Sequence, residues 1–104
     1  MASALTEGLS PAQLDQFRVL RQRFVAGLPL RRLEIQNAPT WQARQAALHR
    51  LAGSAGSYGF ERLHQVSLAA EHLSAGADHD VLARALAALV TEIDATGEGT
   101  PQSA

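Results

Sequence analysis

The residue best suited to chemistry in this chain is His49, because its neighbours along a helix are unusually small. Ala52, Gly53 and Gly56 follow it at +3, +4 and +7, and side chains three or four residues apart are neighbours on a helix surface. A neutral imidazole keeps a nitrogen lone pair near pH 7 and can act as a nucleophile without a separate base. A histidine that exchanges a phosphoryl group with another protein must enter that protein's active site, where the attacking and leaving atoms align. Small neighbours would clear that approach.

The two glycines are unfavourable inside a helix, since each lowers the stability of the helix by about 0.8–1 kcal/mol relative to Ala. At about 100° per residue, His49 lies ~140° from the centre of the apolar face that includes Leu51. Gly53, Gly56 and Ala52 fall on the His49 side, so we expect one exposed imidazole on a solvent-facing surface of small residues. The alternative is that the glycines allow two helices to pack closely.

The elements that must position His49 are helices. Apolar residues recur at helical spacing along most of the chain, and Ser10, Thr40 and either Asp78 or Asp80 are expected N-caps. Gly59 is the expected end of the His49 helix. The first predicted helix begins at residue 11 and is interrupted at 27–29. Further helices are predicted at about 29–37, 41–58 and 60–74, and a last helix is predicted to end near 95.

Short loops between amphipathic helices predict an all-α fold, an antiparallel four-helix bundle with an additional N-terminal or kinked helix segment. We expect a flexible leader at 1–9, the bundle at 10–95 and a disordered tail at 96–104. With 104 residues, one domain and one core are expected.

The composition excludes several functions. The formal net charge is −1, which gives no general attraction to nucleic acid or to an anionic membrane. All nine basic residues are Arg and Cys is absent, so lysine and cysteine chemistry are excluded.

The histidines at 64, 72 and 79 lack the i, i+4 spacing of a metal site, and we expect no bound metal. No signal peptide or membrane-spanning run is present, which predicts a cytoplasmic protein, expected to be a monomer.

The segment from His49 to Phe60, HRLAGSAGSYGF, closely resembles the signature of histidine-containing phosphotransfer (HPt) domains of bacterial phosphorelays. The resemblance extends over roughly residues 14–94 and includes the Glu71-His72-Leu73 stretch, where the family commonly has a Leu-Glu pair. It implies a four-helix bundle and phosphorylation of His49 on a ring nitrogen, usually Nε2.

The same resemblance implies the partners, a response regulator receiver domain and a hybrid histidine kinase. It also implies that the chain needs no cofactor of its own, because the receiver supplies Mg²⁺ and the acidic cluster. The protein would then be a phosphocarrier and co-substrate, and not an enzyme.

One position departs from the family pattern. Many members have Lys or Arg at His+3, where this chain has Ala52. Arg50, at His+1, is basic but points about 100° away from His49 on the helix. Gln45, one turn before His49, is better placed to donate a hydrogen bond to the imidazole or to a phosphoryl oxygen.

Two alternatives to a phosphocarrier remain open. The chain could be an adaptor of the same fold that docks on receivers without accepting phosphate. It could also be a structural helical bundle in which the glycines serve packing alone.

Overall fold

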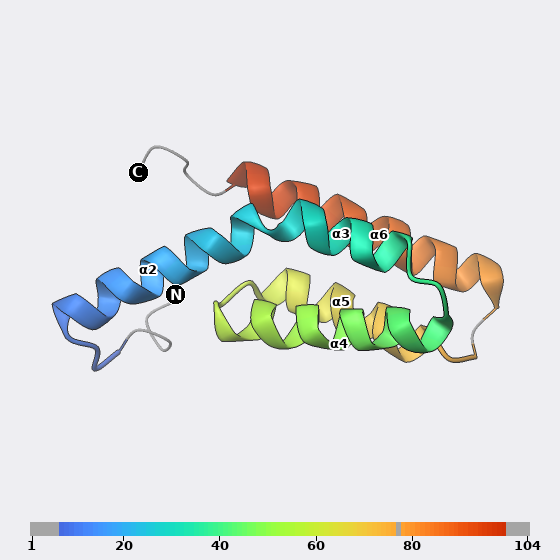
Figure 1. Ribbon diagram of the computed structural model, residues 1–104, viewed down its shortest axis with the longest axis horizontal. Helices are drawn as coiled ribbons and strands as arrows, with labels where there is room; N and C mark the ends of the chain where they lie inside the picture. The colour runs from blue at the N-terminus through green and yellow to red at the C-terminus, as the bar shows by residue number, and fades with distance from the viewer. Residues whose placement is uncertain (1–6, 77, 100–104) are drawn as a thin grey trace.

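The computed structural model describes residues 7–76 and 78–99, and this part of the chain is all-helical (Figure 1). The predicted fold class is confirmed. The helices are α2 (Pro11–Ala26), α3 (Leu28–Gln36), α4 (Trp41–Ser57), α5 (Glu61–Leu73) and α6 (His79–Gly99).

Local capping explains where these helices begin and end. Ser10 and Gln13 form a capping box, in which the Ser10 hydroxyl accepts from the Gln13 N–H at 3.2 Å and the Ser10 N–H donates to the Gln13 side chain at 2.8 Å. The Thr40 hydroxyl accepts the N–H three residues on at 3.0 Å, and the Asp78 carboxylate accepts the N–H two residues on at 2.7 Å. Gly59 follows α4 with a φ of 82°, a left-handed conformation that favours glycine. The predicted cap residues Ser10 and Thr40 and the predicted stop at Gly59 are confirmed, and of the two candidate caps for the last helix the structure selects Asp78.

Four helices enclose one core. Helix α4 packs against α3 and α5, and α6 packs against α3 and α5. Six large aliphatic side chains at the centre are at most 2% exposed. They are Leu28, Ile35, Leu48, Leu51, Leu63 and Leu89.

Helix α2 lies outside this four-helix bundle and extends beyond the α4–α5 loop (Figure 1). Its C-terminal half covers that loop, with the Phe24 ring 5.4 Å from Tyr58 and 5.6 Å from Phe60. The Arg21 guanidinium lies 4.1 Å above the Phe60 ring, and its Nε donates to the Tyr58 carbonyl at 3.0 Å. The predicted additional helix therefore secures the C-terminal end of α4.

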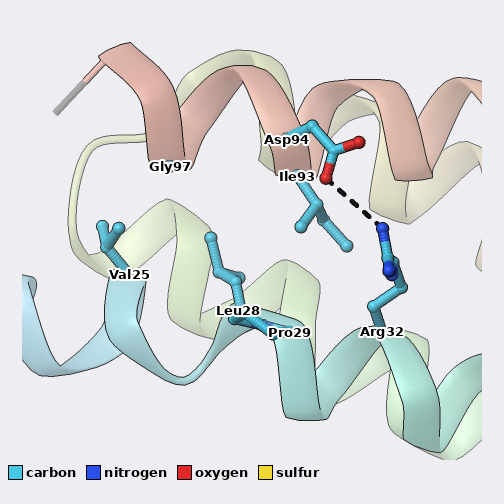
Figure 2. A pocket seen from close by; sticks show the side chains of 7 residues that line it. All are labelled: Val25, Leu28, Pro29, Arg32, Ile93, Asp94 and Gly97. Carbon is cyan, nitrogen blue, oxygen red and sulfur yellow. Dashed lines mark hydrogen bonds and ion pairs between the residues drawn. The ribbon is translucent and has the colours of Figure 1, made fainter.

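Helix α6 closes the bundle beside the α2–α3 junction (Figure 2). Arg32 and Asp94 form an ion pair at 3.4 Å across a hollow of about 280 Å³ that Val25 and Ile93 also line.

The end of α6 corrects one prediction. The helix continues to Gly99 and does not end near residue 95, so the expected disordered tail was wrong for 96–99. Gly97 lines the hollow beside α3, and the Thr96 hydroxyl donates to the Glu92 carbonyl at 2.7 Å. The rest of the expected tail, 100–104, and residues 1–6 of the expected leader lie outside the described residues.

Candidate functional site

His49 projects from the solvent side of α4. Its side chain is 75% exposed, whereas its neighbours Leu48 and Leu51 are fully buried in the core. The helix therefore fixes the backbone of His49 firmly and leaves the imidazole accessible, as the helical pattern predicts.

One ring nitrogen of His49 has a carboxylate partner. Its Nδ1 lies 3.0 Å from Oε2 of Glu71 on α5. An ionised carboxylate only accepts hydrogen bonds, so Nδ1 carries the hydrogen and donates, and Nε2 of the neutral ring retains its lone pair. This contact orients the ring and selects its tautomer.

Glu71 is held between the two helices. Its side chain is only 18% exposed, and its second oxygen, Oε1, is buried without a hydrogen-bond partner among the described residues. The burial of this side chain between α4 and α5 limits the positions that its carboxylate can take. Sequence reasoning missed Glu71 as a site residue, because 22 positions separate it from His49. The available signal was its place in the segment that matches the family's Leu-Glu pair.

Gln45 occupies a different place from the one predicted. Its side-chain amide donates to the backbone carbonyl of Glu71 at 3.4 Å, so its hydrogen bond goes to α5 and not to the imidazole of His49. Gln45 thus ties α4 to the segment of α5 that holds Glu71.

The two glycines after His49 differ in their surroundings. A Cβ added at Gly53 would meet no atom within 4 Å, whereas a Cβ at Gly56 would lie 3.1 Å from Nδ1 of His64. Gly53 leaves open space on the His49 side, as predicted. Gly56 instead gives room to the His64 ring of α5, so the interpretation that it clears the approach to His49 is wrong and the packing alternative holds there.

Ala52 also corrects the prediction of an exposed ring of small residues. It is only 2% exposed, because α5 packs over this flank of α4. His64 reaches across from α5, and its Nδ1 lies 2.8 Å from the Ala52 carbonyl oxygen. A residue at His+3 in this chain therefore faces α5 and not an approaching partner.

Arg50 does not contact His49 and is paired with Glu34 of α3 instead, with its Nη2 2.6 Å from Oε2 of Glu34. Both side chains line an open groove between α3 and α4, which we call the α3–α4 groove. Its lining includes Arg31 and Glu34 of α3 and His49, Arg50, Gly53 and Ser54 of α4.

The described residues contain no group of three or more His, Asp or Glu side chains that could hold a metal ion. None of the helices in this part of the chain is long and apolar enough to cross a membrane.

Comparison with known proteins identifies the fold that holds this site. The model of one family, the Hpt domain, matches residues 10–99, a span that includes all of the described helices. Comparison with curated proteins and with solved structures gives no match. Hpt domains are helical bundles that take part in phosphorelays through histidine phosphotransfer. An all-helical bundle with an exposed, carboxylate-paired histidine on its surface agrees with that match, and we conclude that this chain belongs to the Hpt domain family.

Proposed function

We propose that His49 accepts a phosphoryl group on Nε2 from an aspartyl phosphate of a receiver domain and passes it to, or takes it from, a response regulator receiver. The observation that carries this proposal is the hydrogen bond between Nδ1 of His49 and Glu71, on an imidazole that is 75% exposed. It leaves Nε2 as the nucleophilic nitrogen on a surface that Gly53 keeps open.

The transfer needs no base from this chain. The Nε2 lone pair attacks the phosphorus atom, the bond between phosphorus and the aspartyl oxygen breaks, and its electron pair returns to the partner's carboxylate. No proton leaves the imidazole, because the hydrogen on Nδ1 stays in its bond to Glu71. Transfer to the next receiver is the same step in reverse, with an aspartate oxygen as the nucleophile.

Glu71 supports this step electrostatically. The imidazole ring gains positive charge as the Nε2–phosphorus bond forms, and a carboxylate 3.0 Å from Nδ1 stabilises that charge. Because Glu71 is mostly buried and already positioned, little reorganisation is required. Glu71 acts as a positioning residue, and His49 is the group that bonds to phosphorus.

In this proposal the chain is a phosphocarrier with no cofactor of its own. The receiver supplies the divalent metal ion and its acidic ligands. The partners are a hybrid histidine kinase and a response regulator, and we place the exchange in the cytoplasm.

The test is phosphoryl transfer from purified receiver domains of the same organism, phosphorylated with acetyl phosphate. We expect one or more receivers to label the wild-type chain with an acid-labile, base-stable adduct and to leave His49→Gln unlabelled. His64→Gln is the matched control, since His64 lies on α5 and packs against Gly56; it should label like wild type.

Gly53→Leu tests the open surface separately. The added side chain should block the partner and lower transfer at least tenfold, while Gly53→Ala should transfer at close to the wild-type rate. Undiminished labelling of His49→Gln would rule the proposal out. Receiver binding without any labelling of wild type would instead favour the docking adaptor.

A further inference from the structure

The α3–α4 groove opens directly beside His49, and it lies on the opposite side of α4 from the Glu71 contact. Its α4 wall includes His49 and Gly53, and its α3 wall includes Arg31 and Glu34. A protein that reaches Nε2 of His49 must therefore place part of its surface against this groove. The charges of the groove then influence which partner can approach.

Two of these charges cancel. Arg50 and Glu34 form an ion pair at 2.6 Å, and their side chains are 55% and 53% exposed. The pair spans the groove from α4 to α3 and contributes no net charge to it.

Arg31 is different, because no carboxylate within the described residues pairs with it. Its guanidinium carbon lies 5.4 Å from the centre of the Phe24 ring, a cation–π contact that holds the side chain near the groove without neutralising it. Other arginines form ion pairs away from the groove. Arg32 pairs with Asp94, and Arg62 pairs with Glu92. The groove thus has a local excess of one positive charge in a chain whose formal net charge is −1.

We infer that the α3–α4 groove docks an acidic segment of the receiver domain, and that Arg31 is the residue that selects it. This inference rests on the proposed function. The donor and acceptor of the phosphoryl group are carboxylates, and the metal ion that assists them needs further acidic ligands, so the partner's reactive surface is negatively charged. An unpaired guanidinium in the groove that His49 also lines attracts such a surface during encounter and suppresses binding of a basic one.

The charge on Arg31 should act mainly on association. Electrostatic complementarity between partially exposed groups raises the association rate and weakens with salt, whereas the transfer step inside the complex depends on His49 and Glu71. Glu34 has the opposite effect, because neutralising it frees the charge of Arg50 within the same groove.

The experiment measures phosphotransfer rates over a range of receiver concentrations, at about 50 mM and 300 mM salt, with a receiver that labels wild type. For Arg31→Ala we expect the second-order rate constant to fall about threefold at low salt, and for Arg31→Glu about tenfold. Glu34→Gln should raise it. All three differences should shrink at high salt, while the rate at saturating receiver stays unchanged.

Arg84→Ala is the matched control, because it removes the same charge from the exposed surface of α6, which does not line the groove. It should leave the rate constant within about 1.5-fold of wild type. Circular dichroism and thermal unfolding of each variant show whether losing the Phe24 contact of Arg31 destabilises the fold. A variant that folds like wild type has lost only the charge.

Equal effects of Arg31→Ala and Arg84→Ala, with wild type transferring normally, would overturn the inference and leave the proposed function intact. A slower rate at saturating receiver for Arg31→Ala, insensitive to salt, would also overturn it. Absence of transfer to wild type from every receiver would instead reject the proposed function itself.

Discussion

At the scale of single residues, the hydrogen bond between His49 and Glu71 gives the site its chemical definition. An exposed histidine alone has two tautomers and many orientations. The Glu71 carboxylate at 3.0 Å from Nδ1 selects one tautomer, and in the proposed transfer Nε2 is the nucleophile. The sequence predicted the exposure of His49 and the open position at Gly53. It did not predict the Glu71 contact, because that pairing depends on the lateral register of α5 against α4.

Glu71→Gln tests this contact. The amide can still accept a hydrogen bond from Nδ1 of His49 but has no charge to stabilise the ring as it becomes positive. A charge-assisted hydrogen bond contributes about 1 kcal/mol more than a neutral one, so transfer to His49 should slow about fivefold.

The measurement is the single-turnover rate at saturating receiver, together with the nitrogen chemical shifts of His49, which report the tautomer. Glu61→Gln is the control, since Glu61 is at the start of α5 and pairs with Gln65. A Glu71→Gln rate equal to wild type, with the tautomer unchanged, would show that Glu71 has no part in the transfer.

At the scale of the helix, α4 combines one open glycine with one packed glycine. A Cβ at Gly53 would have no atom within 4 Å, whereas Gly56 faces the ring of His64, which in turn contacts the Ala52 carbonyl. The helical wheel placed both glycines near His49 and could not distinguish them, because only the position of α5 reveals which one is covered. For the same reason, the helical wheel predicted an exposed Ala52, which the structure shows to be buried.

The two glycines should therefore respond differently to Ala. Gly53→Ala should raise the free energy of unfolding by about 0.8 kcal/mol through helix propensity. Gly56→Ala gains the same propensity but presses its Cβ against His64 and strains that residue's hydrogen bond, so it should be about 1 kcal/mol less stable than Gly53→Ala.

Urea unfolding of both variants gives the comparison. In a His64→Ala background the contact is absent, and Gly56→Ala should then stabilise as much as Gly53→Ala does. Equal stabilisation by both substitutions in the wild-type background would contradict the packing role of Gly56.

At the scale of the whole molecule, the bundle fixes the backbone of His49 and leaves its ring exposed to solvent. Helix α4 packs against both α3 and α5, so α5 supplies the Glu71 contact to His49 and α3 contributes Arg31 to the groove that His49 lines. Helix α2 secures the far end of α4 through Arg21 and Tyr58. These contacts join segments that are distant in the sequence, so the local sequence around each residue does not predict them.

Most of the fold could be predicted from local signals. Caps at Ser10 and Thr40, the stop at Gly59 and the spacing of apolar residues define the helices, because these signals act within a few residues. The end of α6 could not be predicted in this way, since its last turn contains Gly97 and Gly99, whose low helix propensity favours an earlier end than the structure shows. The partners of Arg50 and Gln45 could not be predicted either, because they lie on the neighbouring helices α3 and α5.

In the proposed transfer, Nε2 of His49 bonds to phosphorus while Nδ1 remains protonated beside Glu71. The most direct measurement is nuclear magnetic resonance of the ¹⁵N-labelled, phosphorylated protein, which detects the coupling between phosphorus and each imidazole nitrogen. We predict coupling to Nε2 of His49 and a proton on its Nδ1. Coupling to Nδ1, or to a nitrogen of His64, His72 or His79, would contradict it.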